Sequence, residues 1–146
     1  MKPRTRARSV ALQVLYEIDL TGHPPGTVLE ERLAEMPLEE KLSEFASQIV
    51  MGVLPLLEKL DHFIAQHAPE WPLEQVASID RNILRIALWE IAASNQTPIK
   101  VAINEAVELA KVYGSDSTPR FVNGVLGSLA ERHSEILRMF KQSGPP

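Results

Sequence analysis

Apolar residues recur at intervals of three and four along most of this 146-residue chain, and this spacing constrains the fold more than any other feature. At 100° per residue, such spacing places the apolar side chains on one face of a helix. The first predicted helix shows the pattern in the stripe Ala7, Val10, Ala11, Val14, Leu15 and Ile18. The strict alternation of apolar and polar residues that indicates strands is nearly absent. The sequence therefore predicts an all-α protein.

Prolines, glycines and capping residues set the expected ends of the helices. The first helix is expected from about Thr5 to Leu20. The others follow at about 27–35, 38–67, 79–93, 99–113 and 119–133. The longest of them contains Gly52 and Pro55. We expect a kink there, because proline removes a backbone donor and clashes with the preceding turn.

Composition indicates one cytoplasmic domain. The chain has the length for a single core, predicted at residues 1–138, and residues 139–146 are expected to form a flexible tail. It contains no cysteine, which excludes disulfides, thiolate zinc sites and cysteine nucleophiles. No uncharged apolar run reaches the roughly 18 residues that a membrane span needs. Glu17 and Asp19 interrupt the one stretch that resembles a signal peptide.

Features that support catalysis or metal binding are missing from the sequence. His62 and His67 are five residues apart, which is the wrong spacing for two ligands on one helical face. No phosphate-binding loop, dinucleotide fingerprint or nucleophile elbow is present. The acids of residues 17–80 single out no pair and are typical of a solvated helical face. We therefore expect a protein that is no enzyme and binds neither a metal nor a cofactor.

The distribution of charge is more informative than the net charge of −4. Residues 17–80 hold 13 acids against three Lys or Arg, whereas residues 1–16 hold no acid at all. The basic residues of that N-terminal arm are Lys2, Arg4, Arg6 and Arg8. In an extended or fraying segment, arginines at this spacing can follow the phosphates of a nucleic acid strand and stack on its bases. A solvated, disordered terminus is the competing explanation.

The segment 121–126 places the turn-forming pair Asn123-Gly124 inside a helix-periodic pattern. Glycine in a helix interior costs about 1 kcal/mol relative to alanine, so its presence needs a reason. Close packing of helices is one reason, and exposure of the backbone and the Asn123 amide to a ligand is another. Just upstream, Thr118-Pro119 has the pattern of a helix cap followed by proline.

The first predicted helix has a second apolar line, formed by Leu12, Tyr16 and Leu20 at a spacing of four. A helix with two apolar sides must have an apolar surface packed against each of them. One interpretation is burial between two layers of helices, and the other is a surface for a partner.

Three segments resemble helices of the NusB transcription antitermination family, in the order and spacing of that family. They are residues 78–91, 98–111 and 120–126. The first helix, where basic residues lead into residues 11–16, is similar as well. The resemblance covers nearly the whole chain and is weakest from Thr21 to about Leu42.

This resemblance implies an all-α fold of two small packed helical bundles. It also implies a factor that binds boxA-type single-stranded RNA together with NusE, a small-subunit ribosomal protein, within the antitermination complex of RNA polymerase. Carried over residue by residue, it assigns RNA contacts to Lys2, Arg4, Arg6, Arg8, Arg120, Phe121 and Asn123. It places Tyr16 and Asp80 on the side that faces the ribosomal partner. The motif at Arg120 is expected to lie beside the basic arm.

Two departures from the family pattern and three alternatives remain. The arm is less dense in arginine than in some members, so we expect weak RNA affinity without the partner. Pro119 stands where many members have a polar residue. A NusB-like domain also occurs fused to RNA cytosine methyltransferases, which is the first alternative. The second is an assembly factor that binds protein alone, and the third is a homodimer that occludes its own arm.

Overall fold

The computed structural model describes residues 1–68 and 73–142. Every regular element in these residues is helical, so the predicted all-α class is confirmed. Within the same residues, no helix combines the length and the apolar character that a membrane crossing requires.

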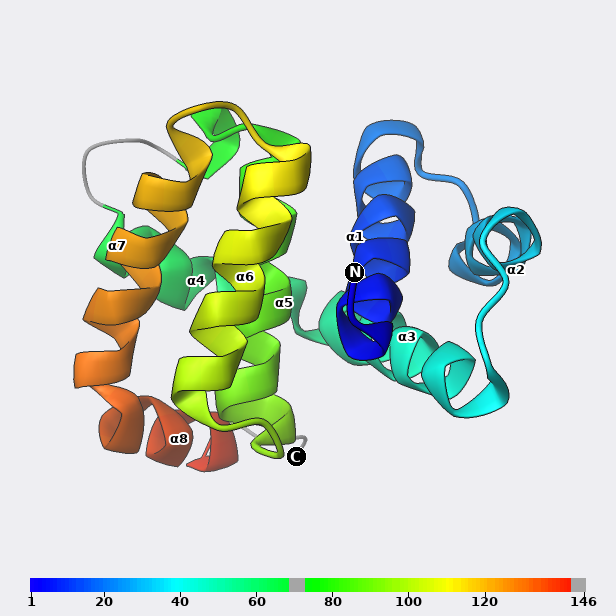
Figure 1. The fold of residues 1–146 in the computed structure, drawn as a ribbon. Helices are drawn as coiled ribbons and strands as arrows, with labels where there is room; N and C mark the ends of the chain where they lie inside the picture. The colour runs from blue at the N-terminus through cyan, green and yellow to red at the C-terminus, as the bar shows by residue number, and fades with distance from the viewer. Residues whose placement is uncertain (69–72, 143–146) are drawn as a thin grey trace. The chain divides into compact units, whose positions relative to one another are not determined.

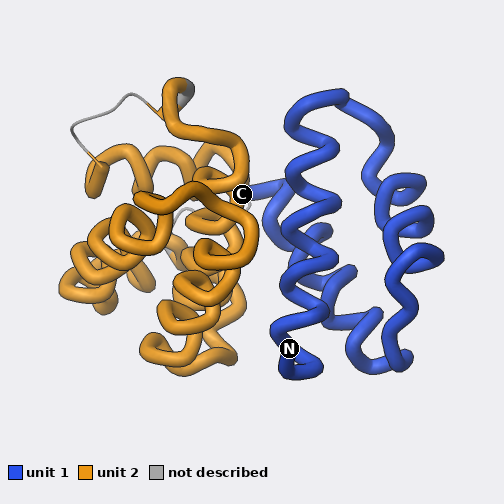
Figure 2. Tube along the Cα trace, turned by 45° about the horizontal axis from the view of Figure 1, so that its top comes forward, with its two compact units in different colours: residues 1–56 blue, residues 57–146 orange. Residues whose placement is uncertain are grey.

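The chain divides into two compact units, residues 1–56 and 57–146 (Figure 2). The division falls beside Pro55, inside the segment predicted as one long helix. In the structure α3 (Glu40–Val53) ends there, the 3-10 turn η1 (Leu54–Leu56) follows, and α4 (Leu57–His67) begins. The predicted interruption is therefore found, and it coincides with the boundary between two helical units.

The first unit consists of α1 (Pro3–Thr21), α2 (Pro25–Glu35) and α3 (Figure 1). Helix α1 packs against both α2 and α3. It ends at Gly22, whose φ of 72° lies in the left-handed region that glycine adopts without a Cβ clash. The core of this unit is formed by small and branched side chains, among them Val10, Leu15, Val28, Ile49 and Val53.

The second unit is built around α5 (Ser78–Leu88), which packs against α4, α6 (Ile99–Tyr113) and α7 (Thr118–Glu131). The short 3-10 turn η2 (Leu73–Gln75) precedes α5, and the π-helical turn η3 (Trp89–Ser94) follows it. Helices α6 and α7 lie side by side (Figure 1). The largest fully buried side chains of this unit are Leu60, Ile64, Ile83, Leu84, Ile86, Leu88, Leu109, Leu126 and Leu129.

The C-terminal end differs from the expectation of a helix ending near His133 and a tail from residue 139. Helix α7 ends at Glu131, and a further helix, α8 (His133–Gln142), follows. Ile136 and Phe140 are four residues apart on α8 and are both buried. The Phe140 ring stacks on Phe63, with ring centroids 5.2 Å apart. Residues 139–142 are therefore helical, while 143–146 lie outside the described residues.

Candidate nucleic-acid interface

The basic arm is helical, not extended. Helix α1 begins at Pro3, a residue whose fixed φ suits the first turn of a helix. Arg4 and Arg8 are one turn apart and share a face, while Arg6 lies on nearly the opposite side. The sequence predicted a helix from about Thr5, and the structure begins it two residues earlier, so Arg4, Arg6 and Arg8 are all helical.

The three arginines of the arm lie in different environments. Arg4 and Arg6 are exposed, as is Lys2. Arg8 is only 2% exposed. The guanidinium carbon atoms of Arg4 and Arg8 lie 4.5 Å and 5.1 Å from the centroid of the same ring, that of Phe45 in α3. Three of the four predicted RNA-contacting residues of the arm are thus on the surface, and Arg8 is not.

The field at this end of α1 favours anions. The first turn contains no acidic residue, and the N-cap residue Lys2 makes no capping hydrogen bond through its side chain. The unpaired backbone N–H groups of a helix N-terminus carry partial positive charge. Here the exposed cations of Lys2, Arg4 and Arg6 add to that charge, which gives a local site of positive potential.

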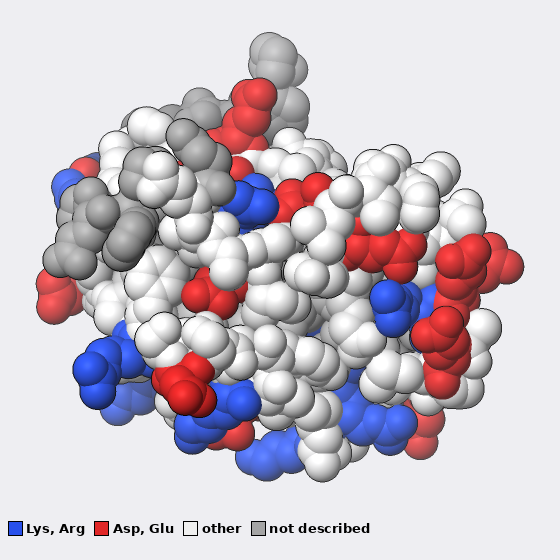
Figure 3. Space-filling model, turned by 90° about the horizontal axis from the view of Figure 1, so that it is seen from above, with Lys and Arg blue, Asp and Glu red and all other residues white. Residues whose placement is uncertain are grey.

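Acidic side chains are distributed differently. Figure 3 shows one group of Asp and Glu at the right-hand edge of the face in view, and others spread among the basic residues over the rest of that face. Helix α2 carries Glu30, Glu31 and Glu35, all exposed. A surface that mixes charges in this way is unsuited to bulk binding of polyanions. It leaves the end of α1 as a localised positive site, because salt screens exposed charges beyond about 10 Å.

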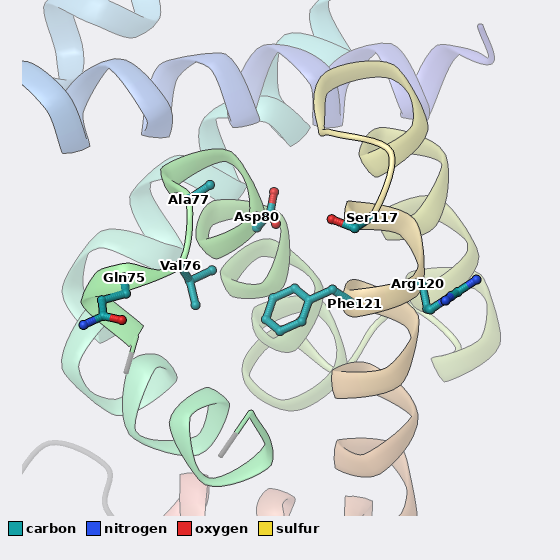
Figure 4. Close-up of a pocket in the computed structure, with 7 residues that line it drawn as sticks. All are labelled: Gln75, Val76, Ala77, Asp80, Ser117, Arg120 and Phe121. Carbon is teal, nitrogen blue, oxygen red and sulfur yellow. The ribbon is translucent and has the colours of Figure 1, made fainter. Parts of the chain in front are cut away.

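A pocket of about 420 Å³ lies at the start of α7. The aromatic ring of Phe121 and the side chain of Val76 point into it (Figure 4). Asp80 and Ser117 face one another across one end, and Arg120 extends away from the centre (Figure 4). The lining residues are Gln75, Val76, Ala77, Asp80, Ser117, Arg120 and Phe121.

Thr118 organises this end of the pocket. Its buried hydroxyl donates to Asp80 Oδ1 at 2.9 Å and accepts a hydrogen bond from the Ser115 backbone N–H at 2.9 Å. A Cβ atom at Gly114 would lie 2.5 Å from the Cβ of Thr118, so this turn requires glycine. The predicted capping role of Thr118 was wrong, because it is the first residue of α7 and Ser117 is the N-cap.

Burial raises the pKa of the Asp80 carboxyl above its ordinary value, and the hydrogen bond from Thr118 offsets part of that rise. A carboxylate oxygen accepts hydrogen bonds, and an aromatic ring stacks on flat groups. The pocket therefore combines the apolar side chains of Phe121 and Val76 with a hydrogen-bond acceptor, the Asp80 carboxylate. The exposed guanidinium of Arg120 lies at its edge.

The structure brings together residues that the sequence assigned to different ligands. Arg120 and Phe121 were predicted to contact RNA, and Asp80 was predicted to face the ribosomal partner, yet all three line one pocket. Asn123 is exposed two residues further along α7. A Cβ at Gly124 would meet nothing within 4 Å, so close packing does not explain that glycine.

The second apolar line of α1 divides into three environments. Leu12 is fully buried, Tyr16 is half-buried and Leu20 is 60% exposed. The explanation by core burial therefore holds for Leu12. Tyr16 and Leu20 leave apolar surface uncovered at the C-terminal half of α1, and a contact role for Tyr16 stays a prediction.

Five residues of these two sites were not anticipated: Phe45, Gln75, Val76, Ala77 and Ser117. Nothing in the sequence links Phe45 to the arm, because the contact joins α3 to α1 across the fold. Val76 is four positions before Asp80 and Ser117 is three before Arg120, so proximity along the chain was their only available signal.

The sequence matches one family model and relatives that share a single name. The family model described as NusB family matches residues 5–131. Transcription antitermination protein NusB of Roseiflexus castenholzii is 48% identical over 134 residues, which cover 90% of this chain and 94% of the relative. The protein of the same name from Bacillus pumilus is 41% identical, covering 88% and 95%.

Solved structures agree with the sequence relatives. A crystal form of NusB from T. maritima has a TM-score of 0.83 and 32% identity, covering 94% of this chain and 98% of that one. A crystal structure of the antitermination factors NusB and NusE in complex with double-stranded RNA has a TM-score of 0.79 and 28% identity. It covers 95% of this chain and 98% of that one. This chain belongs to the NusB family.

Proposed function

We propose that this chain is a transcription antitermination factor. It binds boxA-type RNA together with NusE and promotes read-through by RNA polymerase in ribosomal RNA operons. The observation that carries the proposal is the 48% identity, over nearly full length, to proteins named for antitermination. Such a factor works beside RNA polymerase in the bacterial cytoplasm and needs no catalysis or cofactor of its own.

The end of α1 supplies the electrostatic part of RNA binding in this proposal. Lys2, Arg4 and Arg6 are exposed beside a helix N-terminus and neutralise backbone phosphates. Arg8 contributes differently, because a residue 2% exposed does not reach solvent phosphates in this conformation. In this proposal the phosphate contacts of the arm are those of Lys2, Arg4 and Arg6.

The start of α7 supplies base recognition. The ring of Phe121 offers a stacking surface in a pocket large enough for a nucleobase, and the amide of Asn123 is exposed nearby. Specific RNA recognition mostly targets unpaired bases that stack on aromatic side chains and are read by polar groups. Arg120 at the edge of the pocket adds a charge-assisted contact to the backbone.

NusE contacts are proposed at Tyr16 and Asp80. Because Asp80 lies in the pocket of Arg120 and Phe121, the partner and the RNA meet there. Joint binding of this kind raises the affinity of the assembly without tight contacts from either component. The methyltransferase alternative is weaker, since the chain covers 94% of a relative named as an antitermination factor.

The test is fluorescence anisotropy of a labelled boxA-type RNA against this protein, with and without purified NusE, over a range of salt concentrations. We expect NusE to tighten binding and a scrambled RNA to compete poorly. Competition by single-stranded RNA and by double-stranded RNA shows which form this chain prefers, since the solved NusB–NusE complex contains double-stranded RNA. Binding of NusE with no RNA binding under any condition would leave the protein-only assembly factor as the better assignment.

A further inference from the structure

Phe45 of α3 is in contact with two arginines of the basic arm. The guanidinium carbon of Arg4 lies 4.5 Å from the centroid of its ring, and that of Arg8 lies 5.1 Å from it. Phe45 is half-buried, Arg8 is buried and Arg4 is exposed. The ring therefore contacts one buried arginine and one exposed arginine, and of the two only Arg4 can reach a ligand.

The ring adds a favourable contact to a pair of like charges. Two cations one helical turn apart repel each other, and the positive end of the helix macrodipole adds to the repulsion. The π face of an aromatic ring attracts a guanidinium group and restricts its rotamers. A guanidinium stacked through its plane keeps N–H groups along its edge, and these are the groups that bind phosphate in a bidentate way.

We propose that Phe45 is a positioning residue for RNA binding, and that its ring holds Arg4 in place to receive a backbone phosphate. This inference rests on the proposed function of the chain. Arg8 is the buried arginine in contact with the same ring. Arg4 then binds phosphate at a lower cost in side-chain entropy than a freely rotating arginine.

Replacing the ring with an aliphatic side chain separates positioning from packing. Phe45→Leu and Phe45→Met keep an apolar side chain at the edge of the core but remove the π face. Phe45→Tyr keeps the ring. Circular dichroism melts of all three variants show whether each is folded at the temperature of the binding measurement, and the two aliphatic variants provide independent tests.

We expect Phe45→Leu and Phe45→Met to weaken binding of boxA-type RNA by about two- to fivefold, and Phe45→Tyr to bind like the unaltered chain. Arg4→Ala is the second half of a double-mutant cycle. In the Arg4→Ala background, Phe45→Leu should have no further effect on RNA affinity. A structural role of the ring would not depend on Arg4 in this way.

The possible results separate this inference from the proposed function. If the unaltered chain binds RNA and the aliphatic variants bind equally well, Phe45 has no positioning role and the function stands. Equal weakening with and without Arg4 also overturns the inference, because the ring then acts through something else. If the unaltered chain binds no RNA with or without NusE, the proposed function falls and the inference falls with it.

Discussion

At the scale of single residues, two arginines of the arm illustrate how one residue type takes different roles. Arg6 is exposed, whereas Arg8 is buried against Phe45. Arg6→Ala should weaken RNA binding and reduce the slope of log affinity against log salt by about 0.7, since one phosphate contact to a single strand is lost. Its unfolding free energy should not change. Anisotropy over a salt series and urea unfolding measure the two quantities.

Arg8→Ala is the matched variant and should give the opposite pattern. Loss of a buried cation–π contact should lower the unfolding free energy by about 1–3 kcal/mol and leave the salt slope nearly unchanged. A slope that falls equally in both variants would mean that Arg8 leaves its buried position to contact RNA.

Asp80 gives a prediction about pH. Burial raises the pKa of its carboxyl above the ordinary 3.8, so the folded protein binds this proton more readily than the unfolded chain. The stability that the proton provides is present below pH 3.8 and is lost as pH rises through the raised folded pKa. Asp80→Asn should therefore stabilise the protein at pH 7, because Asn still accepts the hydrogen bond from Thr118.

The gain should shrink as pH is lowered toward 4, where Asp80 itself takes up the proton. Urea unfolding of both proteins at pH 7 and pH 4 measures the difference. A gain of equal size at the two pH values, or a loss at pH 7, contradicts the explanation by burial.

At this scale the sequence predicted the identity of several candidate residues but not their grouping. Arg120, Phe121 and Asp80 came from a resemblance to a family, and their meeting in one pocket depends on the packing of α5 against α7. The bond between Thr118 and Asp80 joins residues 38 positions apart. No local pattern encodes such a pair.

At the scale of helices, local signals predicted most boundaries. Gly22 ends α1 in the left-handed conformation, and Pro98 and Pro119 lie at the starts of α6 and α7. Features that depend on tertiary contacts were not predicted. Helix α8 has no cap signal and is instead anchored by buried Ile136 and Phe140.

The ion pair of Arg85 is a second example. Arg85 donates two hydrogen bonds to the carboxylate of Asp61 in α4, both at 2.7 Å, and the two residues are 24 positions apart. The packing of α4 on α5 brings Asp61 to Arg85, so no local pattern predicts this pair.

Helix α7 offers a prediction based on its two interior glycines. A Cβ at Gly124 or at Gly127 would meet nothing within 4 Å. Each replacement by alanine should therefore stabilise the protein by about 1 kcal/mol, because alanine has the higher helix propensity. Urea unfolding of the two variants measures this gain.

RNA affinity should distinguish Gly124→Ala from Gly127→Ala. Gly124 is exposed beside Asn123, so Gly124→Ala should weaken RNA binding by blocking access to the backbone. Gly127 is only half-exposed and one turn away, so Gly127→Ala should bind RNA normally. Equal affinity of both variants and the unaltered chain would leave Gly124 without a functional explanation.

At the scale of the whole molecule, the apolar periodicity was sufficient to predict an all-α fold, and Pro55 marked the point where the two units divide. Chain length predicted that both units belong to one domain, and this stays a prediction. A unit of 56 residues buries a smaller fraction of its surface than a larger domain and is marginal by itself. We therefore predict that residues 1–56 unfold together with the rest of the chain.

The two tryptophans provide the test, because Trp71 and Trp89 both follow residue 56. Tryptophan fluorescence therefore reports on residues 57–146, whereas far-ultraviolet circular dichroism reports on the helices of both units. For a single cooperative domain the two urea transitions should coincide. Arg8→Ala, which alters only the first unit, should then shift the fluorescence transition as far as the dichroism transition. A fluorescence midpoint unmoved by Arg8→Ala would show that the units unfold independently, and that the chain comprises two domains.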